Sequence, residues 1–399
     1  MRLSKITALL IVLILAVGTG TAIAAENSSE NFKEIRTVED FDRIRNDLSG
    51  NYKLMNDLDF NDAKRAEWEQ IGNDRIGFTG VFDGNGKTIY NYSSSADENS
   101  RESGGFFKMI GENGSVKNLS LKNALASGNE NIGVLTDINK GKIENCHSLN
   151  SESIANTVAG GLVGLNNRGE IINCSSSGTV FSETAGGLVG FNAGGKIKNC
   201  KSSAEVNGIY AAGGIAGDNS NVDSEILNCY SEGTIKSTER AGGIAGGNYN
   251  AKIRYCYSTS RLTEESKEAG GIVGVNEGNV SDCISINAVI NGMRQTYFEK
   301  NPEKDTVPRL KAGEKSYIGR ISSGANVWEE KPIDCFAWNQ IETNKFRFNG
   351  DNGKDASGMK IWKMFPNGVW SGWDQEVWKS GPNGLPILKW EKSENPNAV

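Results

Sequence analysis

Histidine, proline and clusters of basic residues are scarce in this chain of 399 residues. Its one histidine, His147, cannot supply the pair that the zinc-peptidase pattern His-Glu-x-x-His requires, so no such protease domain is expected. Only 7 prolines accompany 49 glycines, which argues against a disordered proline-rich linker. The net charge of -6, without clustered Lys and Arg, makes nucleic acid an unsuitable partner.

Long apolar runs are also missing beyond the N-terminus. Residues 6–17 are apolar, follow Arg2 and Lys5, and precede Ala-Ile-Ala at residues 22–24, which is the pattern of a secretory signal peptide. No later stretch approaches the roughly 20 apolar residues that a transmembrane helix needs. We therefore expect a signal peptide over residues 1–24, no membrane span in the mature chain, and a secreted or cell-surface location.

Two sequence blocks repeat along most of the chain. The first is Ala-Gly-Gly-Leu-Val-Gly at 159–164 and 185–190, Ala-Gly-Gly-Ile-Ala-Gly at 212–217 and 241–246, and Ala-Gly-Gly-Ile-Val-Gly at 269–274. The second block begins at Ile89, Val116, Ile143, Ile171, Ile197, Ile226, Ile253 and Val280, with gaps of 26 to 29 residues. Two residues later comes Asn91, Asn118, Asn145, Asn173, Asn199 or Asn228, then Tyr255 and Asp282. The next residue is Tyr92, Leu119, Cys146, Cys174, Cys200, Cys229, Cys256 or Cys283.

Polar and small apolar residues alternate after each cysteine. Cys200, Ser202, Ala204 and Val206 occupy one face of this pattern, with polar residues between them. A period of two is typical of a strand, whereas a helical repeat would place apolar residues three and four apart. If each repeat is one coil, equivalent residues stack at about 4.8 Å. The predicted fold class is therefore all-β, a parallel β-helix (solenoid).

Each repeated position has a predicted role. The Gly-Gly pairs fit corners that need positive φ or close backbone approach, and the asparagines fit a turn in which the amide bonds to neighbouring backbone. The cysteines are interpreted as buried apolar filler, because Tyr92 and Leu119 replace them in the first two coils. Parallel stacking points their Cβ atoms side by side, which disfavours disulfides, so we expect free thiols there and at Cys335.

The Gly-Gly-Leu-Val-Gly and Gly-Gly-Ile-Ala-Gly blocks, followed by Ile-x-Asn-Cys-x-Ser-x-Gly-x-Val, resemble the GLUG motif, which is named for the pattern Gly-Leu-any-Gly. The resemblance covers about residues 36–390, including an opening segment around Phe-Thr-Gly-Val-Phe-Asp-Gly-Asn-Gly at 78–86. It implies a pectin-lyase-like right-handed parallel β-helix. Such repeats occur in cell-surface or secreted proteins of bacteria and archaea, including surface adhesins and the non-catalytic regions of IgA-specific metallopeptidases. It implies no reaction and provides no catalytic residues.

Both ends of such a stack are open edges that need a cover. Thr37-Val38-Glu39-Asp40 resembles a capping box, which predicts a short N-terminal helical cap extending to about Asp47. Seven of the eight tryptophans lie in the last 72 residues, which predicts an aromatic-rich C-terminal cap rather than a sugar platform. A polar insertion from Asn291 to Ser316 interrupts the repeat, and it is a candidate cover for the outward apolar pair Ile284 and Ile286.

The expected organisation has seven parts. They are a signal peptide (1–24), a linker (25–35), an N-terminal cap with the opening strands (36–80), the GLUG-type β-helix repeats (81–290), an insertion loop (291–316), a last coil with the C-terminal cap (317–390) and a tail (391–399).

Possible reactive groups do not form a recognisable site. Cys146 and His147 are neighbours on a predicted strand and so point to opposite faces, which leaves His147 solvated. Gly86-Lys87-Thr88 has the wrong spacing from Gly80 for a phosphate-binding loop and is interpreted as a turn. The acidic stretch that starts at Asp57 lacks the glycine and glutamate of a calcium loop.

A carboxylate pair is the remaining catalytic possibility. The outward residues Glu205 and Glu232 are placed in matching positions of adjacent coils, about 5 Å apart. A solvated polar face is the favoured interpretation, because fold analogy alone gives no function.

We therefore predict no catalytic, cofactor-binding or metal-binding residues and no cofactor. The predicted function is a structural or adhesive surface protein, with a surface polysaccharide or cell-surface protein as partner. The alternative is a polysaccharide-binding or polysaccharide-cleaving protein, either a lyase or a glycosidase.

Overall fold

The computed structural model describes residues 31–62, 68–94, 104–287 and 289–292. It also describes short segments at 317–319, 322–325, 336–338, 342–343, 357–359, 373–381 and 385–391. The predicted signal peptide, most of the insertion loop and Cys335 lie outside the described residues. So does the tail beyond Glu391.

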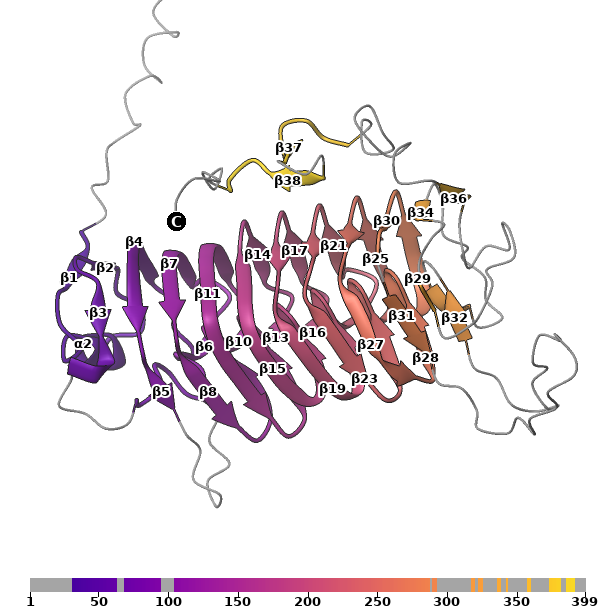
Figure 1. Cartoon of the computed structure of the whole chain (residues 1–399). Helices are drawn as coiled ribbons and strands as arrows, with labels where there is room; N and C mark the ends of the chain where they lie inside the picture. Colours follow the sequence, from indigo (N-terminus) through magenta and orange to yellow (C-terminus); the bar gives the residue numbers. More distant parts are fainter. Residues whose placement is uncertain are drawn as a thin grey trace, which may run out of the picture.

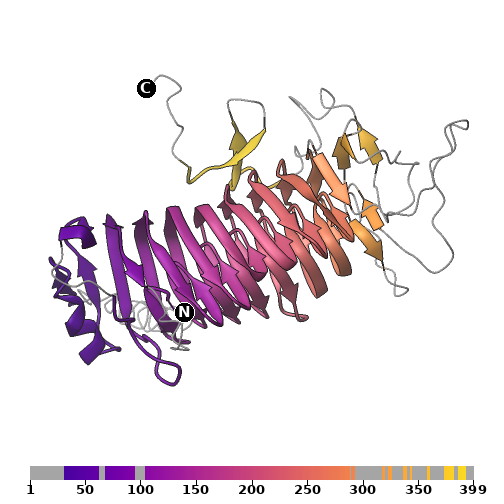
Figure 2. The same ribbon diagram turned by 60° about the horizontal axis from the view of Figure 1, so that its bottom comes forward.

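The described chain forms a long stack of coils whose strands pair in parallel with those of the coils before and after (Figures 1 and 2). Strand β11 (Lys142–Ala155), for example, pairs with β7 (Ser115–Lys122) on one side and β15 (Ser175–Gly186) on the other. Among the described residues the only helical segments are α2 (Phe41–Asn46) and the 3-10 turn η1 (Phe60–Asp62). The all-β parallel β-solenoid predicted from the repeats is confirmed.

Equivalent strands stack at five positions of the coil, and several long strands occupy more than one position. The first position holds β4 (Val81–Tyr90), β7, β11, β14 (Glu170–Ile172), β17 (Lys196–Lys198), β21 (Glu225–Leu227), β25 (Ala245–Arg254) and β29 (Val273–Ser281). The second holds β11, β15, β18 (Lys201–Ser202), β22 (Tyr230–Ser231), β26 (Tyr257–Ser258), β30 (Ile284–Ser285), β34 (Phe336–Trp338) and β36 (Ser357–Met359). The third holds β5 (Ser93–Ser94), β8 (Leu125–Gly128), β11, β15, β19 (Glu205–Gly213), β23 (Thr234–Ser237), β27 (Arg261–Ser266), β31 (Val289–Gly292) and β35 (Glu342–Thr343).

The fourth and fifth positions flank the Gly-Gly blocks. The fourth holds β9 (Asn131–Gly133), β12 (Val158–Gly160), β15, β19, β24 (Arg240–Gly242), β28 (Glu268–Gly270) and β32 (Tyr317–Gly319). The fifth holds β6 (Phe107–Ile110), β10 (Thr136–Asn139), β13 (Val163–Asn167), β16 (Val189–Ala193), β20 (Ala216–Ser220), β25, β29 and β33 (Ser322–Ala325).

The Gly-Gly blocks are required because backbones approach closely at these corners. A Cβ added to Gly160 would lie 2.0 Å from the carbonyl oxygen of Val163, and one added to Gly187 would lie 2.1 Å from that of Gly214. The described glycines with positive φ are Gly72, Gly86, Gly178 and Gly194, none of which belongs to an Ala-Gly-Gly-Leu or Ala-Gly-Gly-Ile block. The Gly-Gly pairs were predicted to be needed either for positive φ or for close backbone approach. Close backbone approach is therefore the correct reason.

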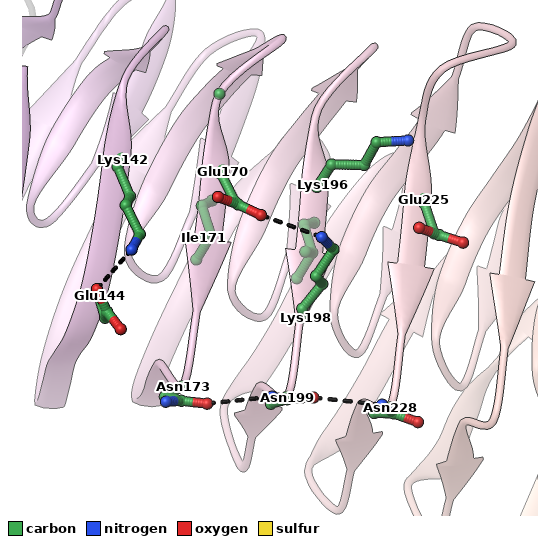
Figure 3. Close-up of polar contacts among 12 residues, drawn as sticks. Lys142, Glu144, Glu170, Ile171, Asn173, Lys196, Lys198, Asn199, Glu225 and Asn228 are labelled. Carbon is green, nitrogen blue, oxygen red and sulfur yellow. Dashed lines mark hydrogen bonds and ion pairs between the residues drawn. The ribbon is translucent and has the colours of Figure 1, made fainter. Parts of the chain in front are cut away.

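The turn between the first and second strand positions needs the left-handed backbone region. Asn145, Asn173, Asn199 and Asn228 have φ between 52° and 55°, a conformation that asparagine tolerates better than most residues. Instead of bonding to the backbone as predicted, Nδ2 of Asn199 donates to Oδ1 of Asn173 and Nδ2 of Asn228 donates to Oδ1 of Asn199, each over 3.3 Å (Figure 3). Asn145 donates in the same way to Asn118 over 3.1 Å. We call this the turn ladder.

A second column of asparagines lies inside the solenoid and was not identified from the sequence. Its members are Asn139, Asn166, Asn192, Asn219, Asn248 and Asn276, all at most 3% exposed. Nδ2 of each of the first five donates to Oδ1 of the asparagine in the next coil over 2.8 to 2.9 Å. Several also donate to a carbonyl three residues later, as Asn192 does to Gly195. This buried ladder therefore both closes the turn after the fifth strand position and joins the coils.

The cysteines fill the core at the start of the second strand position. Cys146, Cys174, Cys200, Cys229 and Cys256 are buried free thiols, and Cys283 is buried in the same column. Leu119 pairs with Cys146 in the preceding coil, which confirms that this position accepts a plain apolar side chain. Burial raises the pKa of the Cys146, Cys200 and Cys256 thiols well above their ordinary value.

The first coil departs from the predicted register. The spacing predicts Tyr92 at the cysteine position, but Lys87 is the residue that pairs with Leu119. Ile89 consequently lies further along β4 than predicted. The register shifts between Asp83 and Lys87, because these two residues are four apart whereas their partners Lys117 and Leu119 are two apart.

Strands β1 (Lys33–Ile35), β2 (Tyr52–Leu54) and β3 (Leu58–Asp59) begin the stack, and β1 lies within the segment expected to be a linker. Helix α2 is at this end of the molecule (Figure 1). The carboxylate of Asp40 accepts hydrogen bonds from the backbone N–H groups of Arg36 and Thr37 over 2.8 and 3.1 Å. Phe41, at the start of α2, packs against the aromatic rings of Trp68, Phe82 and Phe106.

Replacing Asn192 with alanine tests the buried ladder. The substitution removes the donor to Asn219 and Gly195 and the acceptor for Asn166, so we expect a loss of about 2–4 kcal/mol in the free energy of unfolding. Chemical denaturation measures it. Asn156→Ala is the control, because its 2.6 Å bond to Asn129 is exposed and should be worth less than about 1 kcal/mol. Equal losses in the two variants would contradict a special role for burial.

Thiol titration tests the cysteine column. In the native protein the six buried thiols should not react with a thiol reagent, because burial keeps the reagent out and also raises the pKa of the Cys146, Cys200 and Cys256 thiols. After denaturation all seven cysteines of the chain should react. A mass corresponding to disulfides under non-reducing conditions would contradict the unpaired column.

Candidate functional site

His147 lies on the outer face and Cys146 in the core, so the two cannot form a catalytic pair. The prediction that His147 is solvated is wrong. Its Nδ1 lies 2.9 Å from the hydroxyl of Ser175, and its ring stacks on Trp390 with centroids 5.4 Å apart. Burial, with a smaller contribution from Lys201, lowers the pKa of His147 to about 4.

The cover over this face is a C-terminal hairpin of β37 (Trp378–Ser380) and β38 (Pro386–Leu388) that lies along the side of the stack (Figure 1). Trp390 donates to the carbonyl of Asn199 over 2.8 Å, and Glu391 pairs with Lys201 over 2.6 Å. The hairpin also buries an outward row of side chains: Tyr230, Tyr257, Ile284 and Ile286, in contact with Trp373, Trp378 and Leu388.

These contacts revise two expectations. Trp373, Trp378 and Trp390, the C-terminal tryptophans whose side chains the structure describes, cover a flank of the solenoid rather than its open end. Ile284 and Ile286 are covered by this C-terminal segment, whereas the sequence suggested the insertion loop. The contact between the repeats and the C-terminal segment could not be predicted from the sequence, because the C-terminal segment does not follow the period of the repeats.

The proposed carboxylate pair is not formed. Glu205 pairs in register with Thr234, and its carboxylate contacts Lys236 over 2.6 Å. Glu232 lies two residues earlier in that coil, where its backbone N–H donates to Ser202. The matching of Glu205 with Glu232 was wrong, because the two residues stand at different distances from the cysteines of their coils.

The acidic stretch at Asp57 serves local structure. Asp57 accepts from the backbone N–H of Thr88 over 2.8 Å, and Asp59 accepts from the amide of Asn91 over 2.8 Å. Residues 86–88, which were interpreted as a turn, lie instead within strand β4, next to the register shift between Asp83 and Lys87. No group of three or more His, Cys, Asp and Glu side chains in the described part of the chain is arranged to hold a metal ion.

Charges of alternating sign cover the outer face of the first strand position (Figure 3). The residues in register there are Lys142, Glu170, Lys196, Glu225 and Lys252. Each charge thus faces the opposite charge in the neighbouring coils, and Glu170 also contacts Lys198 over 3.0 Å. Because such exposed pairs contribute at most about 1 kcal/mol each, their main effect is to avoid like-charge repulsion between coils.

A different cluster stands on the outer side of the fourth and fifth strand positions. We call Tyr210, Asp218, Arg240 and Tyr249 the Asp218 cluster. Arg240 Nη2 lies 3.4 Å from Asp218 Oδ2, and its guanidinium lies 4.3 Å from the ring centroid of Tyr210 and 5.4 Å from that of Tyr249. Asp218 is only 7% exposed. Burial raises the pKa of Asp218, and the nearby Arg240 partly offsets that rise.

Two buried polar atoms of the Asp218 cluster have no hydrogen-bond partner in the structure. They are Oδ1 of Asp218 and Nε of Arg240. This cluster was not predicted, because its residues lie away from the outward positions beside the cysteines. A usable signal was present: Asp218 is the one charged residue at a position that Leu165, Phe191, Gly247 and Val275 occupy in neighbouring coils.

Exposed apolar side chains line the corner next to the Asp218 cluster. Ile154 and Phe181 are paired in adjacent coils and are 39% and 47% exposed. In the next coil an extra residue is accommodated between Gly208 and Ala211, and Ile209 and Tyr210 in this turn are each 53% exposed. We call Ile154 and Phe181, together with Ile209, which lies two residues beyond the register partner of Phe181, the apolar row.

Comparison with known proteins gives matches to the repeats. The model of the GLUG motif matches residues 155–180, 182–207 and 237–263. Halomucin of Haloquadratum walsbyi is 37% identical over 95 residues, which are 24% of this chain and 1% of that protein. A protein of Evansella cellulosilytica that carries the name Gly-rich membrane protein is 34% identical over 128 residues, or 30% of this chain and 15% of its own length. The chain thus spans a small part of these relatives.

Solved structures with a similar course of the chain carry names of IgA1 proteases. One from Bacteroides ovatus is 21% identical, with a TM-score of 0.48 over 90% of this chain and 93% of that one. A second, named IgA1 protease, is 17% identical, with a TM-score of 0.43 over 82% of this chain and 22% of that one. No helix in the described part of this chain is long and apolar enough to cross a membrane.

The stacked parallel strands and the repeated corners define the class as repeat proteins with a β-solenoid fold. Within that class the chain carries repeats of the GLUG motif, matched at residues 155–180, 182–207 and 237–263, as its Gly-Gly-Leu and Gly-Gly-Ile blocks indicated.

Removing the Trp390 ring tests the covered flank. Trp390→Ala should expose His147 and raise its pKa from about 4 toward the ordinary value of about 6.5. NMR titration of the single imidazole measures the change. Lys389→Ala is the control, because its side chain contacts Glu376 within the hairpin instead. An unchanged pKa in Trp390→Ala would contradict burial of His147 by the hairpin.

Docking of the hairpin should also depend on pH. The released imidazole binds a proton below about pH 6.5, whereas the docked imidazole binds one only near pH 4. Docking should therefore weaken as the pH falls through this interval and change little above it. Tryptophan fluorescence of the native protein follows the release, and a signal independent of pH between 7 and about 4 would refute the coupling.

Proposed function

We propose that the protein is an exported surface protein without catalytic activity, which acts in adhesion or in the structure of a surface layer. The apolar row is the observation that carries this proposal. Large apolar side chains exposed on adjacent coils are typical of a surface that contacts a partner. Because the coils below them are joined by parallel strands and by amide ladders, the row is held on a rigid support.

Other features support the same function. Residues 1–24 have the pattern of a signal peptide, which would place the mature protein outside the cytoplasm. Helix α2, with Phe41 and Ile44 buried, is suited to cover the first coil and thereby prevent edge-to-edge growth. The coil is proposed to be right-handed, in accordance with the general preference for parallel crossover connections. The proposed partners are a surface polysaccharide or a cell-surface protein.

Cleavage of a polysaccharide is the alternative function. It would require carboxylates placed on both sides of a scissile bond. On the outer faces Glu205 contacts Lys236, Glu170 contacts Lys198 and Glu225 contacts Arg254, so these carboxylates are engaged with cations between coils. This arrangement favours binding over cleavage.

The experiment compares binding of the fluorescently labelled full chain to bacterial and archaeal cells and to a polysaccharide panel. The double variant Ile154→Ser and Phe181→Ser should lose most of the binding, because it removes apolar contact area from two adjacent coils. Val222→Ser is the matched control, since Val222 is 65% exposed and outside the row.

Assays for reducing ends and for unsaturated products are run on the same polysaccharides. We expect no turnover, and turnover above that of buffer would replace the adhesive proposal with the enzymatic alternative. Equal binding by the double variant and the wild type would remove the apolar row as the contact surface.

A further inference from the structure

We propose that Asn113 is the attachment site of an N-linked glycan. The inference rests on the export that the proposed function assumes, and it adds a covalent modification that this function does not include. Asn113-Gly114-Ser115 has the Asn-x-Ser/Thr pattern of a glycan acceptor in a secreted protein. The pattern alone does not single out this residue, because it recurs at Asn27, Asn91, Asn118, Asn173 and Asn279.

The turn that contains Asn113 is longer than the equivalent turn of the next coil. It joins β6 to β7, and the residues on its two sides, Ile110 and Ser115, pair with Asn139 and Lys142. Ile110 and Ser115 are five residues apart, whereas their partners are three apart. The turn therefore has two residues that no residue of the next coil matches, and it protrudes from the stack.

The base of this turn is tightly packed and its tip is exposed. The backbone N–H of Gly114 donates to the carbonyl of Gly111 over 2.8 Å, and a Cβ added to Gly114 would lie 2.2 Å from the carbonyl oxygen of Phe78. Between the two glycines, Glu112 and Asn113 are exposed. The asparagine is thus presented on a short turn that is fixed at its base, which is the surface setting that a glycan acceptor requires.

The two reactive groups of the acceptor pattern are free. In the described part of the chain neither the amide of Asn113 nor the hydroxyl of Ser115 has a hydrogen-bond partner. Ser115 is half-buried, and its backbone N–H donates to the carbonyl of Gly80 over 2.9 Å. The backbone of the pattern is therefore held by the sheet, whereas its side chains are available to a transferase.

The amides of Asn91 and Asn118 are engaged between coils instead. Nδ2 of Asn91 donates to Oδ1 of Asp59 over 2.8 Å, and Nδ2 of Asn118 donates to Oδ1 of Asp83 over 3.0 Å. Oδ1 of Asn118 also accepts from Asn145 over 3.1 Å. A glycan on either nitrogen would have to occupy the space of these contacts, so it is incompatible with the folded stack whether it is added before or after folding.

The remaining patterns are less suitable or lie elsewhere. Asn173 belongs to the turn ladder, and the hydroxyl of its pattern is that of Ser175, which is 7% exposed and lies 2.9 Å from Nδ1 of His147. Asn279 is half-buried within strand β29. Asn27 lies outside the described residues. Of the patterns that the structure describes, that of Asn113 is the one placed on an exposed turn.

The modification is a substitution at the anomeric carbon of the donor sugar. The proposed donor is an oligosaccharide bound through a diphosphate to a polyprenyl lipid. The bond between C1 of the sugar and the diphosphate oxygen breaks, a bond from C1 to Nδ2 of Asn113 forms, and the amide proton leaves with the released lipid diphosphate. The turn lies between the fifth and first strand positions, whereas Ile154 and Phe181 of the apolar row are on strands of the third. The glycan therefore leaves that proposed contact surface uncovered.

The test isolates the protein from its own organism and maps its peptides by mass spectrometry, with a search for sugars on asparagine. We expect a glycan on the peptide that contains Asn113. The amides of Asn91, Asn118 and Asn173 should be unmodified. Ser115→Ala, produced in the same organism, should lose the glycan because it lacks the hydroxyl of the pattern, whereas Ser115→Thr is the matched control and should retain it.

Circular dichroism shows whether the variants are folded, and Asn113→Gln is a second variant that alters only the exposed tip of the turn. Three results would overturn the proposal: a bare Asn113, a glycan on Asn118 or Asn173 to the same extent as on Asn113, or a glycan retained in Ser115→Ala. A bare Asn113 in a chain that has lost residues 1–24 removes only the glycan. In a chain that still has them, the export assumed by the proposed function fails as well. A glycan on Asn113 without binding to any cell or polysaccharide would support the modification and remove the adhesive function.

Discussion

Hydrogen bonding between parallel strands, repeated in register from coil to coil, is the interaction on which the rest of this structure depends. Where β11, β15 and β19 pair in register, each side chain is placed beside its equivalent in the next coil. The isoleucine, cysteine and asparagine columns are consequences of that placement. So is the alternation of charge from Lys142 to Lys252, since like charges in register would repel.

Features that repeat once in each coil could be predicted from the sequence. The parallel solenoid, the left-handed turn at Asn145 and its equivalents, and the buried cysteines all follow from spacing and alternation. The buried ladder could have been found by the same reasoning, because Asn166, Asn192 and Asn219 each follow the second glycine of a block by five residues. It was overlooked because asparagine was assigned only to turns.

Features that occur once could not be obtained in this way. His147 is covered by Trp390, 243 positions further along the chain by their residue numbers, and no periodicity links the two. The Asp218 cluster depends on a single extra residue before Ala211 that turns Tyr210 outward. Two wrong register predictions have the same cause: Glu205 was matched with Glu232, and Tyr92 was placed in the cysteine column. The number of residues from one repeat to the next does not show where within a coil an extra residue is inserted or one is missing.

The two amide columns have opposite polarity along the axis of the solenoid. In the buried ladder the amides donate toward the C-terminal coil, as Asn166 does to Asn192, whereas in the turn ladder Asn199 and Asn228 donate toward the N-terminal coil, to Asn173 and Asn199. Amide dipoles aligned in one column add up, just as peptide dipoles do in a helix. With the columns antiparallel, their dipoles largely cancel. The stack can therefore be lengthened by further coils without accumulating opposite partial charges at its two ends.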